Sequence, residues 1–318
     1  MLIRPRTVRP PHLRNDAIGL TAFDLKSYLD NWRREINRAL HRCLPDDGRR
    51  SGIIAAMNHS LHAGGKRLRP ILCVAACEAV GGQAKDTLPA CCALEMVHTY
   101  SLIHDDLPAM DNDELRRGRP TCHVVFGEAT AILAGDALLT KAFEQLAGHA
   151  ALQPSQKQAI WLRILYQLAK AAGCSGMIEG QMRDIHSEGR RLEIAQLERL
   201  HRLKTGALIK AAVSMGGEIG VATHQELNAL NRYAEKIGLA FQVQDDILNV
   251  EGDPGQLGKN VGTDFNRGKN TYPALMGLKA AKTRANDLVA EALRALAIFD
   301  TKTEPLRAIA EYIIARKR

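Results

Sequence analysis

The sequence has 318 residues and a formal net charge of +8, and only 4% of its residues are aromatic. No linker rich in Pro, Gly or Ser divides it, which favours one large helical domain over the two average domains that this length would also allow. Seven of the excess positive charges lie within residues 1–14 and 316–318, so the nearly neutral body argues against a nucleic-acid-binding protein, and no apolar run reaches the roughly 18 residues of a membrane span.

The start of the chain differs from the rest. The segment MLIRPRTVRPPHLR has three prolines by position 11 and no apolar period. We therefore interpret residues 1–19 as a disordered basic extension or a misassigned start, with a targeting peptide as the weaker alternative, and residues 20–318 as the folded domain. The seven cysteines have no zinc-site spacing, so we expect small buried side chains in a reducing cytoplasm.

Helical periodicity then runs through the chain, punctuated by clusters of Gly, Pro, Asp and Asn. The predicted helices are 24–43, 50–62, 69–81, 87–107, 128–149, 155–173, 193–202, 204–220, 225–250, 268–297 with a break, and 303–316. No alternation typical of strands competes with this pattern. It predicts an all-α, single-domain helical bundle with its functional site in the core.

The loop at 63–70, AGGKRLRP, precedes an apolar helix. Its glycines allow close backbone approach, and Lys66, Arg67 and Arg69 are placed to gather around an anion at a helix N-terminus. A plain helix start is the alternative interpretation.

The segment at 98–123, HTYSLIHDDLPAMDNDELRRGRPTCH, concentrates charged residues. The helix should end near Leu107 because Pro108 lacks an amide donor, which lets Asp111 fold back toward Asp105. Crowded carboxylate oxygens favour Mg²⁺ shared with substrate phosphates, and the arginines that follow suit phosphate oxygens. The alternative is a solvated, salt-bridged helix end.

Two later helices that are otherwise apolar also carry charged and polar side chains. Lys204 and Thr205 open KTGALIKAAV, where a buried lysine needs an anionic partner unless it reaches solvent. FQVQDDILNV supplies a second carboxylate pair, Asp245 and Asp246, with Gln242 near the face of Asp245. Lys259 and Lys269 lie in the Gly-rich stretch that follows and are placed to close over phosphates.

Six motifs together resemble the bacterial trans-prenyltransferases, in particular their farnesyl diphosphate synthases. They are GGKRLRP (64–70), LEMVHTYSLIHDD (94–106), GDALL (135–139), KTGALI (204–209), FQVQDDIL (241–248) and GKNTYPALMG (268–277), in the order of that family and over roughly residues 20–315. The resemblance implies the isoprenoid synthase bundle with a central active-site cavity. It also implies Mg²⁺, three ions per site with Mn²⁺ as a substitute, and a homodimer.

The resemblance implies roles for individual residues. Metal ligands would be Asp105, Asp106, Asp111, Asp245 and Asp246; isopentenyl diphosphate would contact Lys66, Arg69, His98 and Arg117; and the allylic diphosphate would contact Arg116, Lys204, Thr205 and Gln242. The chain departs from the family at Asn112 and at Asn249, where Asp is usual. An amide oxygen brings no charge, so Asn249 should weaken the second metal site.

The function that follows is head-to-tail condensation of isopentenyl diphosphate with dimethylallyl and geranyl diphosphates. A terpene cyclase would leave the isopentenyl-binding residues idle, and a noncatalytic subunit should have lost more ligands. Tyr100 lies about 7.5 Å below Asp105 along the helix, where a ring obstructs chain growth or only packs between helices. In similar enzymes an aromatic there accompanies a fifteen-carbon product, so farnesyl diphosphate is expected, with the geranyl and geranylgeranyl products as alternatives.

Overall fold

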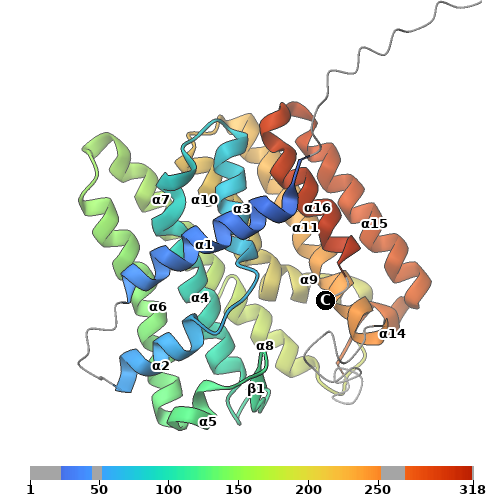
Figure 1. The fold of residues 1–318 in the computed structure, drawn as a ribbon. Coiled ribbons are helices and arrows are strands. Elements are labelled where there is room, and N and C mark those ends of the chain that lie inside the picture. Colours follow the sequence, from blue (N-terminus) through green and yellow to red (C-terminus); the bar gives the residue numbers. More distant parts are fainter. Residues whose placement is uncertain (1–22, 45–51, 252–268, 317–318) are drawn as a thin grey trace, which may run out of the picture.

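Helix follows helix along the chain, and the predicted all-α class is confirmed. The computed structural model describes residues 23–44, 52–251 and 269–316. The longer elements are α1 (Leu25–Cys43), α2 (Gly52–Leu61), α3 (Leu68–Ala79), α4 (Leu88–Asp105), α6 (Glu128–Ala151), α7 (Ser155–Ala172), α8 (Met177–Ser187), α9 (Ile194–His201), α10 (Ala207–Ile219), α11 (His224–Glu251), α15 (Leu278–Ala295) and α16 (Glu304–Ala315) (Figure 1). The short elements are η1 (Ala84–Thr87), β1 (Leu115–Arg116), β2 (Arg119–Pro120), α5 (Cys122–Phe126), η2 (Arg202–Gly206), α14 (Tyr272–Met276), η3 (Leu296–Ile298) and η4 (Thr301–Thr303).

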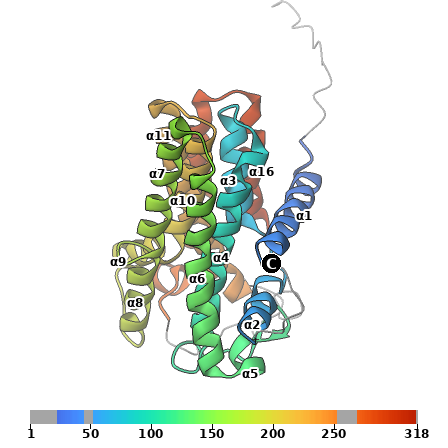
Figure 2. The same cartoon turned by 90° about the vertical axis from the view of Figure 1, so that its left-hand side faces the viewer.

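α4 lies in the middle of the bundle, where it contacts α1, α2, α3, α6, α7 and α10 (Figure 2). Residues 90–97 are at most 2% exposed, on every face of the helix. A helix that is apolar all round is a buried one, and each large side chain in it contributes roughly 1.5–3 kcal/mol by burial. The few polar side chains of α4 must therefore find polar partners inside the protein.

Hydrogen bonds between side chains and distant elements fix the outer helices. The hydroxyl of Tyr233 in α11 donates to the carbonyl of Leu306 in α16 at 2.6 Å, and Tyr28 of α1 donates to Glu78 of α3 at 2.6 Å. Because α16 is held against α11, the end of the described chain at Arg316 lies beside the second aspartate-rich segment.

The observed elements differ from the predicted ones mainly in the short or irregular segments. α8 was not predicted, because Gly176 at its N-cap, Gly180 within it and its charged residues hide the period; it packs on η2. α5 and the two-residue pair β1–β2 were also missed, since single turns carry little periodic signal. The expected gap before 204 is a π-helical turn, η2, that joins α9 to α10. The expected break in 268–297 falls at Gly277, whose φ of 82° is in the region that favours glycine.

Among the described residues, no helix combines the length and hydropathy that crossing a membrane would require. The predicted extension, residues 1–19, lies outside the described residues and stays a prediction.

Candidate active site

The first aspartate-rich segment lies where α4 ends. Helical geometry stops at Asp105, and the N–H of Asp111 donates to the carbonyl of Asp105 at 2.8 Å. The predicted return of the chain after Pro108 is therefore confirmed. Asn112 has φ = 52°, a left-handed conformation that asparagine adopts more readily than most residues. The departure from Asp at this position thus suits the turn.

The pKa of the Asp105 carboxyl is raised by its surroundings. Burial raises its pKa to about 6; Asp111 and Asp106 add repulsion, while Lys204 and Arg116 act in the opposite direction. Neighbouring carboxylates that raise the pKa of Asp105 in this way favour a divalent cation with oxygen ligands.

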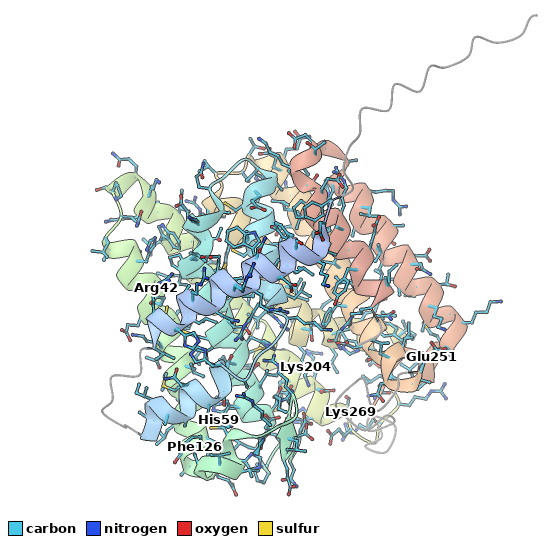
Figure 3. The ribbon with its side chains drawn as sticks, in the orientation of Figure 1. Arg42, His59, Phe126, Lys204, Glu251 and Lys269 are labelled. Carbon is cyan, nitrogen blue, oxygen red and sulfur yellow. The ribbon has the colours of Figure 1, made fainter. Side chains whose placement is uncertain are left out.

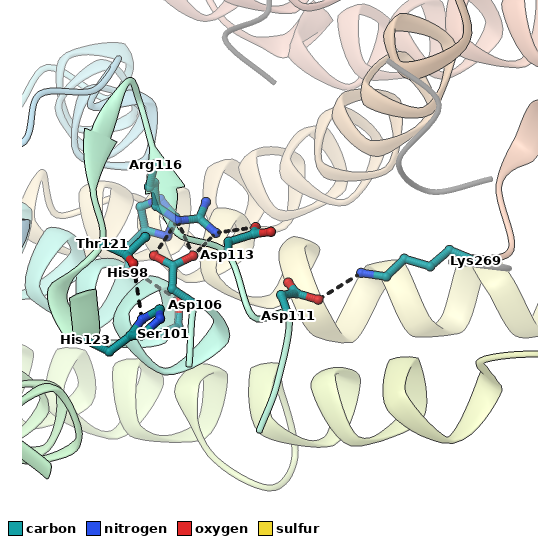
Figure 4. Close-up of polar contacts among 9 residues, drawn as sticks. All are labelled: His98, Ser101, Asp106, Asp111, Asp113, Arg116, Thr121, His123 and Lys269. Atoms are coloured by element: carbon teal, nitrogen blue, oxygen red, sulfur yellow. Dashed lines mark hydrogen bonds and ion pairs between the residues drawn. The ribbon is translucent and has the colours of Figure 1, made fainter. Parts of the chain in front are cut away.

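Asp106 lies in a different environment from Asp105. It is 3% exposed, and Arg116 donates to both of its oxygens, at 2.7 and 2.8 Å from Nε and 2.5 Å from Nη2. Asp113 adds a longer contact of 3.8 Å to the same guanidinium, which the β1–β2 hairpin carries (Figure 4). The two residues expected to hold a metal and a diphosphate thus bind each other here.

A pocket of about 620 Å³ lies beside the loop that connects α2 and α3. Its polar lining is mostly basic and comprises Arg33, Lys66, Arg67, Arg69, His98 and Arg117, together with Glu95. A Cβ on Gly65 would come within 2.6 Å of Nη1 of Arg117, which donates to the carbonyl of Gly64. The glycine therefore lets the hairpin arginine reach the loop.

The structure corrects the expectation for Arg67. Its side chain is buried, with a 2.5 Å ion pair to Glu95 and hydrogen bonds to Asn37 Oδ1 at 2.9 Å and to the carbonyl of Leu61 at 2.8 Å. All three guanidinium nitrogens have protein acceptors, so Arg67 holds the loop and is not directed at a ligand.

Arg69 and His98 line the same pocket, and both side chains have hydrogen-bonding groups that a ligand can contact. Nε of Arg69 is buried and has no hydrogen-bond partner among the described residues. Burial lowers the pKa of His98 well below its ordinary value, and the charges of Arg69 and Arg117 act in the same direction. The imidazole is therefore neutral at pH 7 and suited to a hydrogen bond rather than an ion pair.

Lys204 and Thr205 lie on the π-helical turn η2, an irregularity that is frequent at functional sites. Nζ of Lys204 forms a 2.5 Å ion pair with Asp184 of α8 (Lys204 is labelled in Figure 3). A Cβ on Gly180 would lie 2.1 Å from the backbone nitrogen of Lys204, so this glycine permits α8 to approach. Thr205 donates to Gln242 Oε1 at 2.8 Å, which joins two predicted residues.

The second aspartate-rich segment lies on α11. Nη2 of Arg316 forms a 2.5 Å ion pair with Asp245, and its guanidinium carbon lies 4.1 Å from the centre of the Phe241 ring. Asp246 is 6% exposed and accepts a hydrogen bond of 2.9 Å from the N–H of Tyr272. This hydrogen bond fastens α14 to α11, and the metal-ligand role of Asp246 stays a prediction.

The remaining predicted residues divide between the site and its surroundings. Nζ of Lys269 lies 3.3 Å from Oδ1 of Asp111 (Figure 4). Tyr100 is 5% exposed, its ring packs edge-on against His104 at 5.8 Å, and its hydroxyl has no hydrogen-bond partner in the described part of the chain. Lys259 lies outside the described residues.

Within residues 23–44, 52–251 and 269–316, no three His, Cys, Asp or Glu side chains converge into a group that would hold a metal ion alone. Asp105 and Asp111 fit Mg²⁺, which keeps several waters and takes one or two carboxylates together with substrate phosphates.

Comparison with known proteins identifies the family of the chain. The polyprenyl synthetase family model matches residues 51–310. The chain belongs to this family of prenyltransferases. It is 47% identical to the farnesyl diphosphate synthase of Escherichia coli over 93% of this chain and 100% of that protein, and 44% identical to the geranylgeranyl diphosphate synthase of Cyanophora paradoxa over 93% and 98%. A solved FPP/GFPP synthase from Zymomonas mobilis superposes with a TM-score of 0.80 at 36% identity, covering 91% of this chain and 98% of that one.

Sequence reasoning missed three residues of this polyprenyl synthetase site. Glu95 was visible as a charge in an apolar helix, one turn before His98, and Asp184 as the acid four positions after Gly180. Arg316 had no local signal, because only the packing of α16 brings it to Asp245.

Proposed function

We propose that this chain condenses isopentenyl diphosphate head-to-tail with allylic diphosphates. The observation that carries the proposal is the basic pocket beside α4, where the buried Nε of Arg69 has no protein acceptor among the described residues. A diphosphate supplies acceptors to such a donor, and guanidinium groups bind its oxygens bidentately.

In this proposal the basic pocket holds isopentenyl diphosphate through Lys66, Arg69, His98 and Arg117. The allylic diphosphate binds between the two aspartate-rich segments, where Lys204, Thr205, Gln242 and Lys269 contact it. The contact expected from Lys259 lies outside the described residues and stays a prediction. Arg116 supports that diphosphate with Asp106 as its fixed partner.

Asp105, Asp106, Asp111, Asp245 and Asp246 are the proposed Mg²⁺ ligands. Four of them also have protein partners, namely Arg116 for Asp106, Lys269 for Asp111, Arg316 for Asp245 and the Tyr272 N–H for Asp246. These carboxylates would hold Mg²⁺, which would neutralise the charge of the leaving diphosphate. The allylic C–O bond breaks, the double bond of isopentenyl diphosphate attacks the allylic carbon, and the released diphosphate accepts the proton. The side chains orient the two substrates and stabilise the separated charge.

For the product we propose (2E,6E)-farnesyl diphosphate, formed in two condensations through geranyl diphosphate. Tyr100 supports this length, because its buried ring lies on α4 in the direction in which the chain grows. The relatives include synthases named for fifteen- and for twenty-carbon products, so geranylgeranyl diphosphate is one alternative outcome of a product assay. Geranyl diphosphate, the product of the first condensation, is the other.

We also propose a cytoplasmic homodimer. All seven thiols are free, which suits a reducing compartment. Large apolar side chains are exposed on α6, α7 and α8. α7 contacts both α6 and α8, and Figure 2 shows the three helices next to one another. The exposed side chains include Leu133 at 61%, Leu162 at 64%, Ile178 at 49% and Met182 at 50%. Such a surface is typical of an interface between subunits.

The test is incorporation of radiolabelled isopentenyl diphosphate with dimethylallyl diphosphate and Mg²⁺. We expect labelled prenyl diphosphate from the wild type, and turnover reduced by orders of magnitude in Asp105→Ala and Asp245→Ala with an unchanged helical circular dichroism spectrum. Near-normal rates in both variants would overturn the assignment of these ligands. No incorporation by the wild type would favour a cyclase or a noncatalytic subunit.

A further inference from the structure

The basic pocket contains one carboxylate among its described lining residues, that of Glu95. This side chain belongs to α4, one helical turn before His98, and is 2% exposed. Five basic side chains line the same pocket: Arg33, Lys66, Arg67, Arg69 and Arg117. A buried acid in a pocket suited to an anion calls for a physical explanation, because it repels any anionic ligand.

Glu95 is fixed in place by its contact with Arg67. Oε1 of Glu95 lies 2.5 Å from Nη1 of Arg67, and Asn37 and the carbonyl of Leu61 accept from the other guanidinium nitrogens. Arg67 itself is 3% exposed and has φ = 51° at the N-cap of α3. Neither partner of the ion pair is free to turn toward solvent when a ligand arrives.

The charge of Glu95 extends to two further guanidinium groups. Burial lowers the pKa of Arg69 and of Arg117, and in both residues the charge of Glu95 is the largest influence that opposes this effect. The charge of one carboxylate thus stabilises the charged form of three arginines, of which only Arg67 binds the carboxylate directly. Without it the ligand-free pocket would hold a cluster of buried like charges, which is strongly unfavourable.

We propose that Glu95 is the resident counter-anion of this pocket, a positioning residue that stabilises the empty site and limits its affinity for a diphosphate. The inference rests on the proposed function. A diphosphate that enters brings the negative charge that the arginines lack, and Glu95 then repels it across a low-dielectric interior. Glu95 therefore keeps the pocket folded before the substrate binds and keeps diphosphate binding reversible.

The test compares Glu95→Gln with the wild type, with inorganic diphosphate as the probe. Gln keeps the shape and the acceptor for Arg67 while it removes the charge. EDTA is present throughout, so that the metal-dependent diphosphate site stays empty. Thermal melting is measured with and without the probe, and the dissociation constant is measured by calorimetry.

Without the probe we expect Glu95→Gln to have a lower melting temperature than the wild type. Diphosphate should raise the melting temperature of the variant by more than it raises that of the wild type, and the variant should bind diphosphate roughly tenfold more tightly. The matched control is Glu78→Gln in α3, which replaces a carboxylate that accepts from Tyr28 at 2.6 Å outside the lining of the pocket. It should lower the melting temperature equally with and without diphosphate and leave the dissociation constant unchanged. A purely structural role of Glu95 would give this control pattern.

The other possible results of the Glu95→Gln experiment also support or overturn the proposal. Glu95→Gln that is recovered in soluble form only with diphosphate in the buffer supports the proposal, because the ligand then replaces the missing charge. A variant that is insoluble with and without diphosphate, or that binds it no more tightly than the wild type, overturns the proposal. If diphosphate fails to stabilise the wild type itself, the proposed function of the pocket fails instead.

Discussion

At the scale of single residues, Asp105 gives stability a defined pH dependence. Its folded pKa of about 6 lies above the 3.8 of the unfolded chain, so its neutral form is favoured in the fold. The stability that it contributes is complete below pH 3.8 and is lost as the pH rises through about 6.

We expect Asp105→Asn to remove this loss. In EDTA at pH 8 the variant should melt above the wild type, and the difference should shrink to near zero at pH 4. Thermal melts over this range measure it. An advantage for the Asn variant that is equally large at pH 4 and pH 8 would contradict the assigned burial of the charge.

Tyr100 allows a second test at this scale, on product length. Tyr100→Ala opens space below Asp105 and should shift the products toward twenty carbons and beyond, which chromatography of the dephosphorylated prenols detects. Loss of a buried ring costs about 3–5 kcal/mol, so the assay is best run at low temperature. Tyr100→Phe is the control, because the hydroxyl has no partner among the described residues. An unchanged distribution in Tyr100→Ala would show that another side chain limits the length.

At the scale of elements, the position of α16 brings a cation to a proposed metal ligand. Arg316 is 8% exposed and is fastened by the carbonyl of Phe241 at 3.1 Å as well as by Asp245. A guanidinium on this carboxylate competes with a metal ion for the same oxygen. We therefore expect Arg316, which follows α16, to weaken metal binding at Asp245.

We expect Arg316→Met, measured without substrate, to bind Mn²⁺ several-fold more tightly, by roughly 1 kcal/mol, because the competing charge is gone. Paramagnetic resonance of free Mn²⁺ provides the measurement. Arg294→Met, an exposed position at the end of α15, should leave the affinity unchanged. Equal or weaker binding in Arg316→Met would mean that the arginine supports Asp245 and does not compete at it.

At the scale of the whole molecule, the apolar side formed by α6, α7 and α8 predicts the assembly state. Leu133→Arg places a charge on that side and should convert a particle of twice the 34.9 kDa chain mass into a monomer, as light scattering detects. The control is Ile298→Arg, whose side chain is 46% exposed on η3. Dissociation by both variants, or by neither, would argue against this interface.

The sequence by itself determined the helical architecture and much of the site. Apolar periodicity predicted nearly every long helix, and Pro108 determined where α4 ends, since both depend on neighbouring residues. The resemblance identified Lys66, Arg69, His98 and Lys204. In the structure the first three line the basic pocket, and Lys204 forms an ion pair with Asp184.

Only the tertiary structure decided how the charges of these segments pair. Adjacent aspartates look equivalent in sequence, yet Asp106 binds Arg116 and Asp246 binds the N–H of Tyr272. In the same way Arg67 and Arg69 stand two positions apart and both line the pocket, but Arg67 is paired with Glu95, whereas Nε of Arg69 has no hydrogen-bond partner among the described residues. Such differences depend on which side chain a distant helix brings within about 3 Å, and local patterns do not encode that distance.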